Sequence, residues 1–121
     1  VYEDLSMDER LEKALEFSNF LETQNNQKNI FLKQYYDNLV YYVDGHKISI
    51  TTDVISFCQS MIALEQDEAV LLDDNNTPFN VSNLKEFTRE VLGVYTFASR
   101  KYAYDYAKIK KNRSVEGLTN L

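Results

Sequence analysis

The feature that most constrains the fold is an apolar stripe near the carboxyl-terminal end, with members three or four residues apart. This spacing places its members on one face of an α-helix. Asn83 and Glu86 form a capping box, with Ser82 as the alternative N-cap, so we predict a helix over residues 83–111. Gly93 lies inside this helix at a cost of about 1 kcal/mol relative to alanine, which predicts close packing against another backbone. The stripe consists of Leu84, Phe87, Val91, Val94, Ala98, Tyr102, Tyr106 and Ile109.

A second long helix is predicted in the amino-terminal third. Ser6 and Glu9 form a capping box, and neither proline nor glycine interrupts residues 7–43. The pattern predicts a helix over residues 8–37, roughly 45 Å long at ~1.5 Å per residue. The polar stretch Asn25–Gln27 leaves a kink or a break open. The apolar residues at helical spacing are Leu11, Ala14, Leu15, Phe17, Leu21, Phe31, Tyr35 and Leu39.

The middle of the chain predicts two β-hairpins separated by a short helix. Asp44-Gly45 lies between two β-prone runs, and glycine tolerates the positive φ of a tight turn. Residues 73–78 are rich in Asp and Asn and predict the second turn. The predicted strands are 39–43, 46–51, 69–72 and 79–81, and a helix over 53–65 follows the N-cap cluster Thr51-Thr52-Asp53.

These elements predict a mainly helical α+β fold in a single domain, residues 1–121. Two long antiparallel helices pack together, with the short helix and a small antiparallel sheet of two hairpins beside them. Residues 114–121 form a tail, with Val115, Leu118 and Leu121 available for docking. Residues 1–6 are either an artificial extension or a trimmed end, with Met7 as an alternative start. Helices this long in so small a chain predict a homodimer.

Composition excludes several classes of site. One cysteine rules out an internal disulfide and a multi-cysteine zinc site, and one histidine rules out a histidine cage. The three glycines are too far apart for a phosphate-binding loop. No apolar stretch approaches the ~18 residues of a membrane span, and no secretory signal is recognisable. We therefore expect no membrane association and no secretion.

Two candidate chemical sites have simpler explanations. Asp73–Asn76 is acidic, but its spacing does not fit an EF-hand loop, so we interpret it as a hairpin turn. Cys58 and His46 are a conceivable nucleophile and base. Cys58, however, lies in an apolar run and is expected in the core, where a thiol is inert. His46 is expected to be a solvated turn residue. We predict no catalytic, cofactor-binding or metal-binding residues and no enzymatic activity.

Charge is distributed unevenly along the chain. The net charge of −6 combines −5 over residues 1–22, −5 over residues 65–90 and +5 over residues 100–113. The basic segment also carries tyrosines, a combination that binds single-stranded nucleic acid in some proteins. The simpler interpretation pairs this basic helix with the acidic first helix, within one chain or between two. The candidate partner-binding residues are Arg100, Lys101, Tyr104, Lys108, Lys110, Lys111 and Arg113.

The turn motifs carry a resemblance to phage proteins. Tyr42–Ser49 (YVDGHKIS), an apolar helix, Asp73–Pro78 (DDNNTP) and a long final helix together resemble a phage domain of unknown function that occurs in tail-fibre-assembly-type proteins. The resemblance covers about 75 residues. Leu11–Gln27 is similar to uncharacterised proteins of large tailed phages from marine bacteria. The resemblance implies a non-enzymatic virion or assembly role, with a location in a host cytoplasm or a virion, and assigns no site residues.

Two functional hypotheses follow. The leading one is a phage-type structural or assembly accessory protein that acts through contacts with phage or host proteins. The alternative is a small regulator that binds nucleic acid or the transcription machinery. It would use either the basic carboxyl-terminal helix or the acidic faces. The overall negative charge disfavours nucleic-acid binding, because phosphate contacts dominate that affinity.

Overall fold

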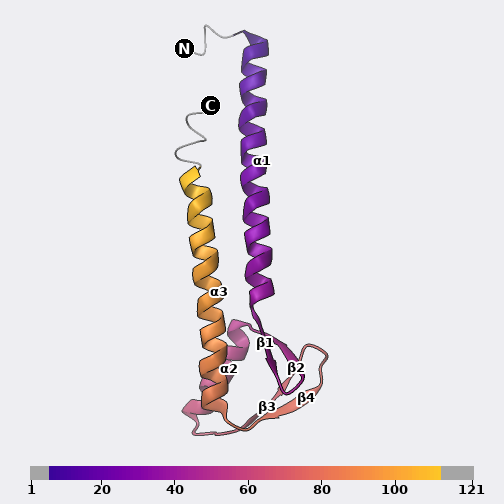
Figure 1. Cartoon of the computed structure of the whole chain (residues 1–121), viewed down its shortest axis with the longest axis vertical. Helices are drawn as coiled ribbons and strands as arrows, with labels where there is room; N and C mark the ends of the chain where they lie inside the picture. The colour runs from indigo at the N-terminus through magenta and orange to yellow at the C-terminus, as the bar shows by residue number, and fades with distance from the viewer. Residues whose placement is uncertain (1–5, 113–121) are drawn as a thin grey trace. The chain divides into compact units, whose positions relative to one another are not determined.

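The computed structural model describes residues 6–112 and contains three helices and two β-hairpins (Figure 1). The predicted fold class is confirmed: the protein is mainly helical α+β, with two long helices packed together. The predicted boundaries differ from the observed ones by one or two residues at most ends. The elements are α1 (Met7–Asn38), β1 (Val40–Val43), β2 (His46–Ser49), α2 (Thr52–Ala63), β3 (Ala69–Leu72), β4 (Pro78–Val81) and α3 (Leu84–Asn112).

The chain forms two compact units, and both long helices contribute to each. The first unit contains residues 1–33 and 102–121, of which 6–33 and 102–112 are described. In it, Gln24 Nε2 donates a hydrogen bond to the Ile109 carbonyl at 3.4 Å. The second unit is residues 34–101 and contains both hairpins and α2. The predicted tail 114–121 lies outside the described residues.

The helix starts follow the predicted caps. Ser6 Oγ accepts from Glu9 N at 3.1 Å, and Thr51 Oγ1 accepts from Val54 N at 3.2 Å. Asn83, rather than Ser82, caps α3, because Asn83 Oδ1 accepts from Glu86 N at 3.2 Å. Each cap satisfies a backbone N–H that has no partner inside its helix. α1 continues as an α-helix through Asn25–Gln27, so the helix is not broken there.

Each hairpin is closed by the residues that the sequence singled out. In the first, Val43 pairs with His46, and Asp44 and Gly45 have φ values of 48° and 80°, the positive φ pair of a type I′ turn. In the second, Leu72 pairs with Pro78. The Asp73 carboxylate accepts from Asn75 N and Thr77 N, both at 2.9 Å, which organises the turn from within.

Along α3, one row of buried or half-buried positions recurs alternately every four and three residues, the heptad spacing of a packed helix. The row consists of Leu84, Thr88, Val91, Tyr95, Ala98, Tyr102, Asp105 and Ile109, and beside it Phe87 is buried and Leu92, Val94 and Ser99 are half-buried. The prediction for Tyr106 was wrong: it is 41% exposed, and Asp105 is buried in its place. The heptad register places position 105 in the buried row. A helical period of 3.6 residues counted from Tyr102 falls between positions 105 and 106, so it does not show which of these two residues is buried.

The expected role of Gly93 was also wrong. Gly93 is exposed, and a Cβ built there would meet nothing within 4 Å. No backbone among residues 6–112 approaches this position closely. No packing contact therefore explains why a glycine, which lowers helix stability, lies at this position.

Candidate interaction surfaces

The second unit carries an apolar groove between α2 and β3, which we call the α2–β3 groove. It has a volume of about 220 Å³. Phe57 from α2 and Leu72 from β3 remain 43% and 59% exposed beside it. Ile48, from β2, is buried. The complete lining is Ile48, Asp53, Val54, Phe57, Leu71 and Leu72.

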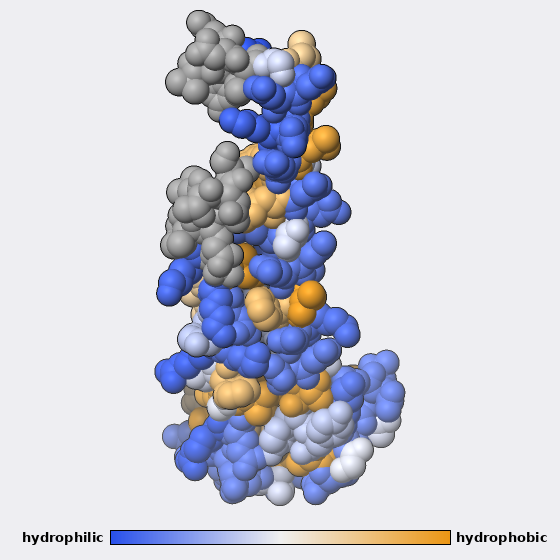
Figure 2. All heavy atoms as spheres, turned by 45° about the horizontal axis from the view of Figure 1, so that its top comes forward, coloured by the Kyte–Doolittle hydropathy of each residue, from blue (hydrophilic) through white to orange (hydrophobic). Residues whose placement is uncertain are grey.

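The chemistry of this groove favours an apolar ligand. Five of its six lining residues are apolar, and Asp53 supplies the single charge. A concave apolar surface with few polar groups is typical of places where another molecule buries a side chain. In the space-filling view, hydrophobic side chains also reach the surface among hydrophilic ones (Figure 2).

The turn of the second hairpin is attached to the first hairpin by side-chain contacts. His46 Nδ1 lies 2.7 Å from Asp73 Oδ2, and the imidazole stacks on Phe79 with ring centroids 4.5 Å apart. Asp74 accepts from Ser49 N at 2.9 Å and from Ser49 Oγ at 2.8 Å. The expectation that His46 is a solvated turn residue was therefore wrong. Its partner is 27 positions away in the sequence.

The electrostatics of this contact follow from its hydrogen bonds. The hydrogen bond from His46 holds the pKa of the Asp73 carboxyl below its usual range, and the backbone N–H groups of Thr77 and Asn75 act in the same direction. Stabilising the ionised form lowers a carboxyl pKa. Asp73 is thus a turn residue that also joins two hairpins. In residues 6–112 no cluster of His, Cys, Asp and Glu could hold a metal ion.

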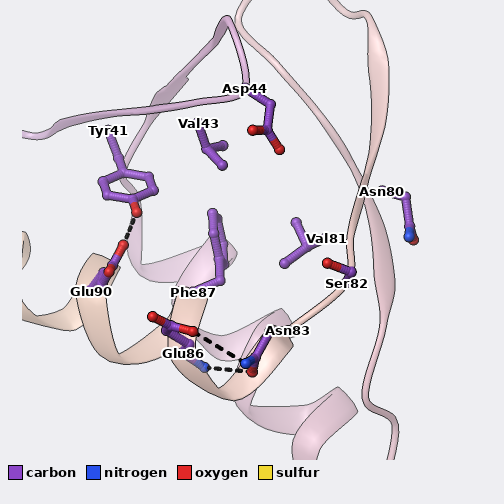
Figure 3. A pocket seen from close by; sticks show the side chains of 10 residues that line it. All are labelled: Tyr41, Val43, Asp44, Asn80, Val81, Ser82, Asn83, Glu86, Phe87 and Glu90. Atoms are coloured by element: carbon purple, nitrogen blue, oxygen red, sulfur yellow. Dashed lines mark hydrogen bonds between the residues drawn. The ribbon is translucent and has the colours of Figure 1, made fainter.

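A second, more polar pocket of about 170 Å³ lies between the hairpins and the start of α3 (Figure 3). Phe87 projects from α3 between Val43 and Val81, and its ring meets that of Tyr41 edge to face. The Tyr41 phenol donates a hydrogen bond to Glu90. Asn83 and Glu86 bond each other within the start of α3, whereas the bond from Tyr41 to Glu90 joins the first hairpin to α3 and favours a role in positioning that helix.

The cysteine lies where the sequence predicted. Cys58 is 1% exposed, and burial raises the pKa of its thiol. Since the thiolate is the reactive form, both effects make this cysteine inert. His46 is held by Asp73 and Phe79, so no observed contact forms the conceivable Cys58–His46 pair.

The predicted partner-binding residues all lie on α3, except Arg113, which is outside the described residues. In the second unit, Arg100 and Lys101 are exposed, and Lys101 Nζ donates to Gln34 Oε1 at 3.4 Å. In the first unit, Tyr104 is 64% exposed, and Lys108 Nζ lies 4.3 Å from its ring centroid. Lys110 and Lys111 are also exposed. Tyr104 is outward-facing, as predicted.

The first unit carries a second exposed apolar surface, on residues 7–19 of α1, which we call the α1 extension. Every residue of it is exposed. Met7, Leu11 and Leu15 are 72%, 57% and 63% exposed, and Phe17 is 46% exposed. Hydrophobic residues occur at intervals along this part of α1, between hydrophilic ones (Figure 2). The predicted apolar stripe is present, but its first half has no partner among the described residues.

Comparisons with known proteins add no relative. The sequence matches no protein-family profile, and neither a curated protein nor a solved structure is significantly similar to it. Among residues 6–112 there is also no helix whose length and hydropathy would let it span a bilayer. The surfaces of the chain itself therefore carry the functional argument.

Sequence reasoning did not find the α2–β3 groove. Phe57 and Leu72 read as ordinary core residues, because each belongs to an apolar run. A partial signal was present: Leu71 and Leu72 are adjacent, and adjacent residues of a strand point to opposite faces. One of them must therefore leave the core of a two-stranded hairpin, and the structure identifies it as Leu72.

Proposed function

We propose that this chain is a non-enzymatic protein that works through protein–protein contacts, as a phage-type structural or assembly accessory protein. The observation that carries the proposal is the α2–β3 groove, with Phe57 and Leu72 exposed beside it. A side chain from a partner protein would bury these apolar surfaces, at a gain of roughly 25 cal/mol per Å² removed from water.

The geometry of the groove suits a protein partner better than a small polar substrate. Its lining offers one carboxylate and no nucleophile or hydrogen-bond donor side chain. Binding through such a surface depends on a few well-buried apolar anchors. The phage-type class is supported by the resemblance of the turn motifs and the final helix, and the hairpins formed by those motifs supply β2 and β3, two of the elements that line the groove.

A small regulator that binds nucleic acid is the second candidate, favoured by one observation. Tyr104 and Lys108 form an exposed aromatic and basic pair near the end of α3. Two arguments make this candidate the weaker one. Lys108 already covers a face of the Tyr104 ring on which a base would stack, and the chain has a net charge of −6.

Affinity capture with two matched variants tests the proposal. Leu72→Asp places a charge in the groove, whereas Val70→Asp places one on the same strand, at a residue that is 62% exposed and does not line the groove. Each is captured, with its partners, from cells that naturally produce the chain, and the partners are identified by mass spectrometry. We expect virion or assembly proteins that are lost with Leu72→Asp and retained with Val70→Asp. Equal capture by both variants would contradict the proposal.

A further inference from the structure

The α1 extension is exposed because α1 outlasts α3 in the first unit. Gln24 lies beside Ile109, three residues before α3 ends at Asn112. Both helices rise ~1.5 Å per residue, so an antiparallel α3 ends level with about residue 21 of α1. Figure 1 shows α1 continuing beyond the last turn of α3. Residues 7–19 therefore run past the described end of the helix that covers the rest of α1.

A mostly apolar row at heptad spacing runs along this extension, includes the polar Ser18 and ends just beyond the extension at Leu21. Met7, Leu11, Ala14, Ser18 and Leu21 follow one another at intervals of four, three, four and three residues. Leu15 lies beside this row and widens it. A row of this kind packs against another helix in a coiled coil. Phe20 and Leu21, at its inner end, are half-buried, so the row becomes covered where α3 begins to accompany it.

The charges around this row select the partner. Residues 7–19 carry four acidic and two basic side chains, so two copies of the extension repel each other. Lys108 and Lys110, in the last two turns of α3, are exposed, and Asp105 is the one acidic residue in the sequence of these two turns. Tyr104 adds an exposed aromatic ring beside Lys108. The end of α3 therefore complements the extension in charge, and Tyr104 offers it one exposed aromatic side chain.

We propose that the chain forms a reciprocal dimer in which the α1 extension of each copy packs on the end of α3 of the other. A two-fold axis makes the two contacts identical, so each copy covers the exposed row of its partner. The acidic side chains of one copy then face the lysines of the other. This inference concerns the first unit and is independent of the α2–β3 groove and of the function proposed for it.

Sedimentation equilibrium of the full chain at micromolar concentration tests the dimer. The expected mass is twice that of the monomer. In the variant Leu11→Glu/Leu15→Glu, both substituted residues are exposed and Glu is as good a helix former as Leu, so the fold is retained and the mass falls to that of the monomer. The control Ile30→Glu changes an apolar residue of α1 that is 57% exposed but lies outside the extension, and it leaves the dimer intact.

Two further variants identify the segment that packs on the α1 extension. Lys108→Glu/Lys110→Glu reverses the charge at the end of α3 and is expected to dissociate the dimer. A chain that ends at Asn112 is expected to remain dimeric. A full chain that is monomeric at every micromolar concentration contradicts the proposal. So does a dimer that survives both Leu11→Glu/Leu15→Glu and the lysine reversal. A chain that dimerises only after residues 113–121 are removed assigns the extension to its own tail and also contradicts the proposal.

Discussion

Asp73 joins the two hairpins through a single carboxylate. It accepts two backbone N–H groups of its own turn and the imidazole of His46 in the other hairpin. All three bonds favour the ionised carboxylate, which is why its pKa lies below the usual value. The fold therefore gains stability from the ionised form of this residue.

This linkage predicts a pH dependence of stability. A carboxyl whose folded pKa is lowered stabilises the fold above its unfolded pKa of about 3.9, and this contribution is lost as the pH falls through the folded pKa. Asp73→Asn should therefore lower the melting temperature at neutral pH, and its difference from the wild type should shrink in the acidic range below about pH 4. Thermal melts across this range measure the effect.

The turn of the first hairpin supplies the control for this experiment. Asp44→Asn changes an exposed aspartate, and asparagine tolerates the positive φ of 48° at that position. We expect little change in melting temperature at any pH. A difference between Asp73→Asn and the wild type that stays constant down to the lowest pH would argue against the role assigned to Asp73.

Substitution by alanine should change the free energy of unfolding in opposite directions at Gly93 and Gly45. Gly93→Ala adds a methyl group to an exposed helical position with open space, so the free energy of unfolding should rise by about 1 kcal/mol. Gly45→Ala also meets no atom, but its φ of +80° strains any side chain, so that variant should be destabilised. Chemical denaturation of both variants measures the two signs. A destabilised Gly93→Ala would show that this face of α3 is covered.

The burial of Cys58 predicts its reactivity. Because the thiol is buried and its pKa raised, a thiol reagent should label it slowly in native buffer and rapidly in denaturant. The rates are followed by mass spectrometry. Equal rates under both conditions would show that α2 does not bury this face.

At the scale of the elements, the helices and turns were predictable because their signals are local. Caps such as Ser6 and Thr51 bond to a backbone group three residues away, and the Asp44-Gly45 turn needs only its own φ values. The misplaced residues depend on distant partners. His46 is positioned by Asp73, and the burial of Asp105 in place of Tyr106 depends on the heptad register in which α3 packs.

The candidate site was less predictable than the elements that form it. The α2–β3 groove depends on the separation between one face of α2 and one face of a hairpin. The sequence of neither segment determines that separation. The α1 extension exists because α1 extends past the described end of α3. How far it extends follows from the register between Gln24 and Ile109. The sequence predicted both helices and the charges but not this register.

We predict that the basic end of α3 does not bind nucleic acid. We expect no measurable binding of single- or double-stranded oligonucleotides near physiological salt, because a net charge of −6 repels polyanions. Replacing Lys108, Lys110, Lys111 and Arg113 by Gln should change only stability or self-association. Fluorescence anisotropy tests this expectation. Micromolar binding that weakens steeply with salt and disappears in the fourfold variant would favour the regulator hypothesis instead.

At the scale of the whole molecule, the two units carry exposed surfaces of different character. The first unit presents an acidic apolar helix and a basic helix end, which suit a second copy of the same chain. The second unit presents an apolar groove, which suits a different protein. Self-association and partner binding should therefore be separable: Leu11→Glu/Leu15→Glu should leave capture of the partner unchanged, and Leu72→Asp should leave the dimer unchanged.

Cross-linking from the α2–β3 groove tests the central claim most directly. A photoreactive phenylalanine analogue replaces Leu72 in one chain and Val70 in a control, and both are irradiated in cells that naturally produce the protein. The account predicts an adduct from position 72 that resists nuclease and contains peptides of a second protein, and little or none from position 70. An adduct that nuclease removes, or equal yields from both positions, would contradict it.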